Sequence, residues 1–438
     1  MTDAPDGNAL ARALAPWVGR GAAAEGLTRL SGGASKETWS FDAVGADGTR
    51  AELILRRDPP GRPSEQGAAD REAVAIGLAH AAGLPVPELL FSSPGPGPGS
   101  GLLPGADLGT AGMVMRRVPG ETIARRILRD EQYAPAHGVL VGQLARFAAG
   151  LHGLAVPDGF PAPDPLEALR AQLDAFAQPD VDQHSEVFEL ALDWLAAHPP
   201  PARDPVLLHG DFRLGNLIVG PEGLRAVLDW ELTHLGNPVE DLGWLCVKAW
   251  RFGAAGPVAG VGSREELLAA YAAAGGAQIS LAELAWWEIL GTLRWGVICL
   301  TQAWAHLSGA HRSVELAAIG RRVCEQEWDL LLLLEPEAAA AAAARRPRLS
   351  GAGAAAPDPY GRPTVSELVE AVREFLTDQV MPGTSGQLAF HARVAANVLA
   401  IVSRELELGQ LAAESATGEG LADAVAARLA VANPRHFA

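Results

Sequence analysis

The segment VLLHGDFRLGNLIVGPEGLRAVLDW, residues 206–230, constrains the fold of this chain more than any other stretch. Three short apolar runs predict three strands, at 206–208, 217–219 and 224–228. A polar loop joins the first two runs, and the turn-rich tetrad Gly220–Gly223 joins the last two. Folding the hairpin back returns Asp229 to the loop that holds Asp211 and Asn216, so three oxygen-bearing side chains can converge.

The chemistry of these three side chains predicts phosphoryl transfer. Carboxylate and amide oxygens suit Mg²⁺, a hard cation that proteins usually share with substrate phosphates. Asn216 and Asp229 would hold the metal. Asp211, at the start of the loop, would orient an attacking hydroxyl instead.

The loop HGDFRLGN resembles the HGDxxxxN motif of the aminoglycoside phosphotransferase family, a branch of the protein-kinase-like fold. LDWE stands where protein kinases carry Asp-Phe-Gly. The resemblance implies that Asp211 is the catalytic base and that Asn216 and Asp229 are the metal ligands. Arg213 takes the place of a phosphate-contacting lysine in many protein kinases, and it is the second catalytic candidate. His209 would orient the loop backbone.

Two other interpretations of this segment stay open. An isolated His-x-Asp is common, and Asp-Trp can simply end a strand. A hydrolase metal centre could instead use four ligands: His209, Asp211, Asp229 and His234. Neither alternative explains Asn216 or the features upstream, so we favour the phosphotransferase.

Upstream, residues 27–57 predict three strands, with GADG as a hairpin signal between the last two. Between the first two strands, where a kinase-like fold places its phosphate-covering loop, stands SGGAS. The resemblance implies that Gly32 and Gly33 let backbone N–H groups approach the phosphates, with Ser35 or Lys36 as further contacts. Taken alone, two glycines in a hairpin usually mark only a turn.

The third strand lacks the lysine that contacts nucleotide phosphates in kinases. The resemblance places Arg56 at that position and Ile54 beside the adenine. Strand alternation puts Arg56 and Arg57 on opposite faces, so only one of them can reach the phosphates. Glu72, on a helix predicted over 70–83, would pair with Arg56. The alternative interpretation is that Glu72 is exposed to solvent, as an isolated Glu on a helix usually is.

A Gly/Pro-rich segment, residues 91–112, predicts a loop between strands. The strand that follows leads into RRVPG, which resembles the hinge of the family. The resemblance implies that adenine bonds to backbone near Arg116 and Val118. Met113 and Met115 could line that pocket, although Met in a strand is more often core.

Composition and charge indicate a soluble cytoplasmic protein. The chain has 438 residues, 48% of them hydrophobic and 20% charged, which suits two or three globular domains. The three cysteines have no metal-ligand spacing and are too few for a disulfide framework. The N-terminal residues lack the regions of a signal peptide, and the most apolar stretch, 295–311, predicts a buried helix rather than a membrane span. A net charge of −17 argues against nonspecific nucleic-acid binding.

The resemblance implies an α+β, bilobal protein-kinase-like fold, with Asp241 bracing the catalytic loop, followed by a small all-α domain. We predict a β-rich N-lobe that binds nucleotide, a mainly helical C-lobe with the acceptor site, an Ala/Gly/Pro-rich linker and a helical domain of unknown role, at 1–118, 119–334, 335–360 and 361–438. The last part resembles an uncharacterised helical domain often found alongside such phosphotransferases. Its apolar faces would serve a homodimer or an acyl-CoA dehydrogenase partner.

The chain is most similar to the kinase-like domain found fused to, or beside, acyl-CoA dehydrogenases. Three sequence segments carry this resemblance: LRRDPPG, LDWELTHLGNP and HRSVELAAIGRR. We therefore predict a kinase that uses ATP and Mg²⁺ to phosphorylate a small-molecule hydroxyl, such as a hydroxyacyl-CoA or a hydroxy acid. One alternative is an aminoglycoside-type antibiotic kinase. Another is a non-catalytic pseudokinase that partners an acyl-CoA dehydrogenase.

Overall fold

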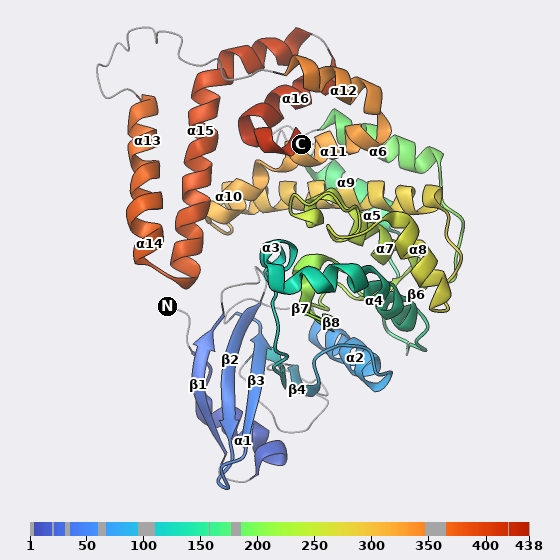
Figure 1. Ribbon diagram of the computed structural model, residues 1–438, viewed down its shortest axis with the longest axis vertical. Coiled ribbons are helices and arrows are strands. Elements are labelled where there is room, and N and C mark those ends of the chain that lie inside the picture. The colour runs from blue at the N-terminus through green and yellow to red at the C-terminus, as the bar shows by residue number, and fades with distance from the viewer. Residues whose placement is uncertain are drawn as a thin grey trace. The chain divides into compact units, whose positions relative to one another are not determined.

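Figure 1 shows the computed structural model. It describes residues 4–19, 22–30, 36–59, 67–94, 110–156, 158–176, 185–346, 365–418 and 420–437. The predicted phosphate-loop residues Gly32, Gly33 and Ser35 lie outside the described residues. The chain packs into two compact units, Met1–Pro163 with Pro201–Leu284 and Asp164–Pro200 with Ala285–Ala438. The four-part division expected from the sequence stays a prediction.

The first unit contains an antiparallel five-stranded sheet in the order β1-β2-β3-β5-β4 (Figure 1). Its strands are β1 Ala23–Arg29, β2 Glu37–Val44, β3 Arg50–Arg57, β4 Leu89–Pro94 and β5 Ala111–Arg116. The three strands predicted over 27–57 are confirmed. The loop predicted over 91–112 is wrong at both ends, because Phe91 to Pro94 belong to β4 and pair with β5, which begins at Ala111. The part of this prediction at 95–109 lies outside the described residues. Phe91 is buried, so apolar packing extends the strand to the point where the Gly/Pro-rich sequence begins.

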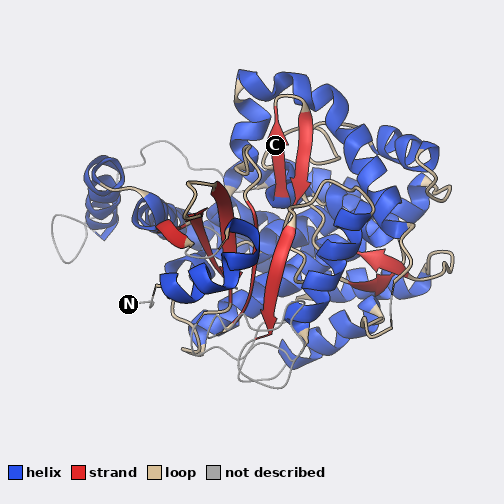
Figure 2. Ribbon diagram, turned by 90° about the horizontal axis from the view of Figure 1, so that it is seen from below, coloured by secondary structure: helices blue, strands red, loops and turns tan. Residues whose placement is uncertain are grey.

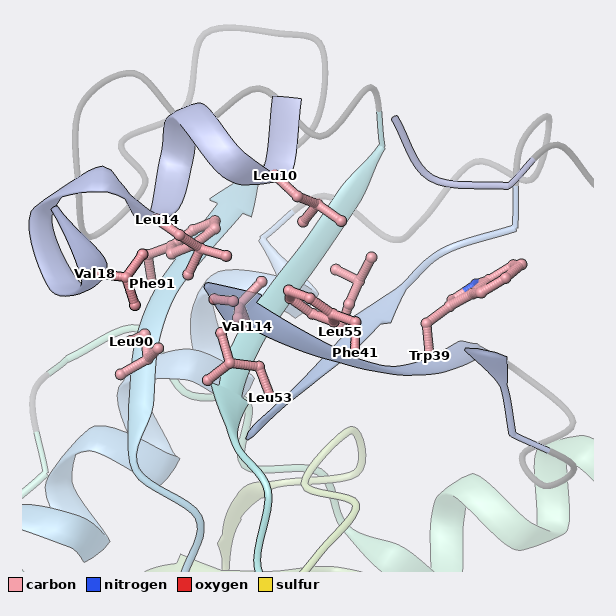
Figure 3. Packing of buried hydrophobic residues seen from close by; sticks show 11 residues of the cluster. Leu10, Leu14, Val18, Trp39, Phe41, Leu53, Leu55, Leu90, Phe91 and Val114 are labelled. Atoms are coloured by element: carbon pink, nitrogen blue, oxygen red, sulfur yellow. The ribbon is translucent and has the colours of Figure 1, made fainter. Parts of the chain in front are cut away.

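One face of this sheet is covered by α1, Gly7–Val18. Figure 3 shows Leu10, Leu14 and Val18 of this helix packed against apolar side chains of the strands. The strands contribute Trp39, Phe41, Ala43, Leu53, Leu55, Leu90, Phe91 and Val114 to the same buried cluster. Fully burying one such side chain stabilises the fold by about 1.5–3 kcal/mol. The side chains on this face are therefore buried in the core, so functional side chains of the sheet are expected on the opposite face.

The rest of the first unit carries the catalytic segment. Its remaining strands are β6 Val206–Leu208, β7 Leu217–Gly220, β8 Gly223–Val227 and β9 His234–Gly236. β7 and β8 form the predicted hairpin, and β6 pairs with β9. Its helices and 3-10 turns are α2 Ala68–Ala81, α3 Ala124–Arg129, η1 Glu131–Tyr133, α4 Ala134–His152, η2 Leu214–Asn216, α7 Val239–Cys246, η3 Lys248–Arg251 and α8 Arg264–Ala273. The strands predicted at 206–208, 217–219 and 224–228 are thus confirmed.

The described part of the second unit is helical. Figure 2 colours the helices of the protein blue and the strands red. Its elements are α5 Pro165–Phe176, α6 Glu186–Ala197, α9 Leu281–Leu307, which begins in the first unit, α10 Val314–Gly320, α11 Val323–Leu334, α12 Pro336–Arg345, α13 Val365–Phe375, η4 Leu376–Val380, α14 Met381–Gly383, α15 Gly386–Gly418, α16 Leu421–Ala432 and η5 Pro434–Phe437. Among the residues described, none of the helices has the length and apolar character needed to cross a bilayer.

Candidate active site

Asp241 holds the backbone of the loop that carries the motif. The carboxylate accepts the His209 N–H over 2.8 Å and the Gly210 N–H over 2.9 Å. Gly210 has a φ of 79°, and a Cβ there would lie 2.2 Å from the Leu232 carbonyl oxygen, so glycine is required. His152, which is buried, bonds to Asp241 over 3.4 Å. The brace that the resemblance implied is therefore present in the structure.

Electrostatics keep this buried carboxylate ionised. Burial by itself would raise the pKa of Asp241, but the hydrogen bond from His152 and the backbone and ring of His209 outweigh it and bring the pKa below its usual range. Tyr271 hydrogen-bonds to the other nitrogen of the His152 ring over 2.8 Å. Burial, followed by the charge of Asp241, raises the pKa of Tyr271 to about 12, so the phenol stays protonated at neutral pH.

Three donors converge on the Asp211 carboxylate. Its Oδ1 accepts from Arg213 Nε over 2.9 Å and from the Trp244 indole over 2.8 Å. Its Oδ2 accepts from Asn216 Nδ2 over 2.6 Å. Charge-assisted hydrogen bonds of this kind are about twice as strong as neutral ones, so the carboxylate has one fixed orientation. Fixed geometry is what a residue that positions an attacking hydroxyl requires.

The sequence interpretation missed Trp244, although a signal existed. Trp244 lies three residues after Asp241 on α7, and positions three apart share one side of a helix. Once Asp241 is assigned to the loop backbone, Trp244 has to face the same loop. The guanidinium of Arg213 also lies 4.6 Å from the centre of the Trp250 ring, which fixes the second catalytic candidate beside Asp211.

The predicted metal ligands are brought together by the hairpin. The backbone N–H of Leu228, next to Asp229, donates to the Asn216 carbonyl over 2.8 Å. Asn216 uses its Nδ2 on Asp211, which leaves Oδ1 as its ligand atom toward a cation. One amide oxygen and one carboxylate fit Mg²⁺, which takes few protein ligands and completes its shell with phosphate and water. Within the described ranges there is no cluster of three or more His, Cys, Asp or Glu suited to a metal.

Asp229 adopts the left-handed conformation, with a φ of 67°. This is uncommon outside glycine but is tolerated by Asp and Asn. It directs the carboxylate at Arg56, whose Nη2 lies 2.6 Å from Oδ1. Burial tends to raise the pKa of Asp229, yet the adjacent guanidinium outweighs burial and the pKa is lowered. Asp229 is thus held as an anion, as a metal ligand must be.

Arg56 and Arg57 lie on opposite faces of β3, as the alternation predicted. Arg56 donates to Glu72 over 2.8 Å, and Glu72, on α2, is fully buried. Arg57 instead pairs with Glu37 at 3.0 Å, on the face covered by α1. The predicted Arg56–Glu72 pair is therefore formed, and the solvated-Glu alternative is wrong.

Two neighbours of this pair were not assigned to it from the sequence. Lys36, immediately before β2, donates to the second oxygen of Glu72. Glu231, the last residue of LDWE, lies 3.9 Å from Arg56. Both contacts are long-range in sequence, so local patterns could not find them.

The predicted hinge follows β5, but two of its N–H groups are already bonded. The Arg116 N–H donates to the Glu88 backbone carbonyl over 2.9 Å, and the Arg117 N–H donates to the Glu52 backbone carbonyl over 3.0 Å. Either group could bond to adenine only by losing its backbone partner. The adenine contact predicted near Arg116 and Val118 stays a prediction. Met115 is buried opposite Ile54, on the same face of the sheet as Arg56.

Contacts of the two histidine rings disfavour the hydrolase alternative. His209 bonds to the Leu228 carbonyl over 2.9 Å and accepts the Asp211 N–H over 3.2 Å, so both ring nitrogens serve the loop. His234 bonds to the Leu232 carbonyl over 2.8 Å and pairs with Glu240 at 3.3 Å. Neither ring presents a nitrogen to a metal without losing such a bond.

The sheet, the braced loop and the hairpin define a kinase-like fold of the aminoglycoside kinase class. It is similar to the structure of a protein from Ralstonia eutropha JMP134 assigned as an aminoglycoside phosphotransferase, with a TM-score of 0.54 and 21% identity, covering 75% of this chain and 98% of that one. It is also similar to spectinomycin phosphotransferase solved with ADP and spectinomycin, with a TM-score of 0.52 and 13% identity, covering 76% and 98%.

Residues 26–287 match the family described as the phosphotransferase enzyme family, and the chain belongs to it. Residues 382–423 match a domain of unknown function, DUF6285. Among curated relatives, acyl-CoA dehydrogenase family member 11 of Gallus gallus is 32% identical over 254 residues, which cover 54% of this chain and 29% of that protein. The human member 11 is 28% identical over 208 residues, covering 43% and 24%. The chain thus spans less than a third of the length of these relatives.

Proposed function

We propose that this phosphotransferase moves the γ-phosphoryl group of ATP to the hydroxyl of a small molecule. The observation that carries the proposal is the Asp211 carboxylate, held by three donors on a loop that Asp241 fixes. Family membership supports the reaction class, and spectinomycin phosphotransferase, which shares the fold, was solved with ADP. Mg²⁺ would be held by Asn216 and Asp229, where it would neutralise charge on the phosphates.

In the proposed reaction, Asp211 accepts a hydrogen bond from the acceptor hydroxyl and aligns its oxygen with the γ-phosphorus. The new P–O bond forms as the bond to the β-phosphate oxygen breaks, ADP leaves, and the hydroxyl proton passes to Asp211. Arg213, bonded to Asp211, keeps a positive charge beside the reacting oxygens and offsets charge that develops there. Little covalent chemistry is needed from the protein, because positioning and charge dominate phosphoryl transfer.

For the acceptor we propose a hydroxyacyl-CoA or a related hydroxy acid. Support comes from the relatives named acyl-CoA dehydrogenase family member 11, which are 32% identical to this chain in Gallus gallus and 28% in human, against 21% for the aminoglycoside phosphotransferase-like structure. An aminoglycoside acceptor is the second candidate, since proteins of that class share the fold. The two candidates differ in charge, because an acyl-CoA is anionic and an aminoglycoside is cationic.

The test is a screen of ATP consumption by the purified full chain with Mg²⁺. Hydroxyacyl-CoAs, free hydroxy acids, aminoglycosides and sugars are offered in turn, and the product is identified by mass spectrometry. Acceptor-dependent ADP release with a gain of one phosphate on a hydroxyacyl compound supports the proposal. Phosphorylation of aminoglycosides alone would select the second candidate. Nucleotide binding without turnover on any acceptor would favour a pseudokinase.

A partner through the C-terminal helices, either a second copy or an acyl-CoA dehydrogenase, stays a prediction. Support comes from α13, where Leu368, Val372 and Phe375 are each about half exposed. These three side chains form an apolar row on α13, and exposed rows of this kind often mark interaction surfaces. Replacing Leu368 and Phe375 by Ser should abolish any self-association seen by analytical ultracentrifugation.

A further inference from the structure

We propose that Lys36 is the cation that contacts the phosphates of the bound nucleotide, and that Arg56 is a positioning residue joining Glu72 to Asp229. This assignment rests on the proposed function, since it supposes that the first unit binds ATP. It differs from the expectation that Arg56 takes over the role of the lysine in the third strand of kinases.

Lys36 and Arg56 share one face of the sheet. Thr38 pairs with Arg56 in the register of β2 and β3, and alternation places Lys36 on the same side as Thr38. The intervening Glu37 is buried on the opposite face, with Arg57. Lys36 also follows directly on the segment in which the sequence predicts the phosphate-covering loop. Its ammonium bonds to Glu72, which Arg56 links to the proposed metal ligand Asp229, so Lys36 lies on the same side of the sheet as these groups.

Both terminal nitrogens of the Arg56 guanidinium already bond to carboxylates. Nη1 donates to Glu72 over 2.8 Å and Nη2 donates to Asp229 over 2.6 Å. A third carboxylate, Glu231, lies 3.9 Å from Nη2. The guanidinium is a rigid planar fork, so turning it toward a phosphate would break at least one of these pairs. If it turned, the part-buried Asp229, whose side chain is 26% exposed, would lose its ion pair, which is unfavourable.

Lys36 can leave its partner without that penalty. Glu72 carries a cation on each oxygen, with Arg56 on Oε1 and Lys36 on Oε2. If Lys36 turns to a phosphate, Glu72 keeps Arg56; if Arg56 turns away, Asp229 loses its ion pair. An ammonium on a flexible stem also has three donors, so it can bond to phosphate and retain Glu72 together.

Chemical labelling provides a direct test, because the chain contains only two lysines, Lys36 and Lys248. The reagent is an acyl-phosphate ester of ATP, used on the intact full-length protein. The lysine amine attacks the acyl carbon, the C–O bond to the phosphate breaks, ATP leaves, and the amine loses its proton to the buffer as the amide forms. We expect acylation of Lys36 that excess Mg·ATP suppresses at least tenfold, as judged by peptide mapping. Acylation of Lys36 that Mg·ATP leaves unchanged would overturn the assignment.

Substitution gives the second arm of the test. Lys36→Met should weaken Mg·ATP binding about 10- to 100-fold, as expected for the loss of a charged hydrogen bond, and leave adenosine binding unchanged. Arg50→Met is the matched control, because it removes one exposed cation from the start of β3 and should change the affinity less than twofold. Lys36→Arg should recover part of the affinity.

The outcomes separate this assignment from the proposed function. If the unmodified protein binds Mg·ATP and Lys36→Met binds it equally well, the assignment of Lys36 is wrong and the proposed function is unaffected. If the unmodified protein binds no Mg·ATP, both fail. Thermal unfolding shows whether the Lys36→Met variant folds. If the variant does not fold, the labelling of the unmodified chain tests the assignment of Lys36.

Discussion

Trp244 donates its indole N–H to the Asp211 carboxylate over 2.8 Å, from the helix that also carries Asp241. One turn of α7 thus fixes the backbone of the catalytic loop through Asp241 and its acidic side chain through Trp244. Trp244 lies outside the motif HGDFRLGN, so the motif alone does not predict the contact with Asp211.

Trp244→Phe tests that contact, since it removes the donor and keeps an aromatic ring. We expect kcat to fall about tenfold, because a hydrogen bond to a charged group is worth about 1.5–3 kcal/mol and two other donors remain on Asp211. The affinity for Mg·ATP should stay within twofold. Steady-state kinetics with the acceptor found in the screen give both values. Trp194→Phe, in the second unit, is the control. A similar fall in kcat in that variant would show that the loss does not come from the Trp244–Asp211 hydrogen bond.

Asp229→Asn should raise the Mg²⁺ concentration needed for half-maximal ATP binding at least tenfold. The substitution keeps the shape and the tolerance of a positive φ but removes the charge that the metal requires. The measurement is ATP binding across a Mg²⁺ titration, with EDTA as the zero point. Asp42→Asn is a matched control, because the two side chains are both 26% exposed and each pairs with an arginine. Equal Mg²⁺ dependence in the two variants would contradict the ligand assignment.

Arg56→Ala and Arg57→Ala should have different consequences, because the side chains lie on opposite faces of β3. Loss of Arg56 removes the bridge between Glu72 and Asp229, so we expect Mg·ATP affinity to fall at least tenfold. Loss of Arg57 leaves buried Glu37 with a weaker partner, so we expect a lower melting temperature and an affinity within twofold. Calorimetry measures both quantities. Equal losses of affinity would refute the register of the strand.

Asp241 should make the fold sensitive to acid. Its pKa is lowered in the folded state, so its ionised form stabilises the fold above the unfolded value of 3.8. That contribution is lost progressively as pH falls below about 4 and through the lowered pKa. Asp241→Asn should therefore lower the urea midpoint at pH 7, and the difference from the unmodified protein should shrink toward pH 3. A difference independent of pH would show that the charge of Asp241 is not what matters.

The sequence predicted the parts of the site that depend on local spacing. The loop with Asp211 and Asn216, the hairpin that returns Asp229, and the opposite orientations of Arg56 and Arg57 all follow from strand periodicity and turn chemistry. The roles of Asp241 and His209 came from the resemblance, and their contacts agree with it.

What the sequence did not reveal depends on tertiary contact. β9 is three residues long and exists through its pairing with β6, so no periodicity marks it. α1 contains Pro16 and was not expected, yet its apolar side chains complete the core of the sheet. The Lys36–Glu72 pair joins residues 36 positions apart, beyond the reach of any local pattern.

In the proposed reaction, Asp211 positions a hydroxyl for phosphoryl transfer. The most direct measurement compares the unmodified protein with Asp211→Asn, following both Mg·ATP binding and transfer of radiolabelled γ-phosphate to the acceptor from the screen. We predict that turnover falls at least a thousandfold while ATP affinity changes less than threefold, because Asp211 contacts neither metal nor nucleotide in the proposed reaction. Loss of ATP binding with turnover retained at saturating ATP would contradict it.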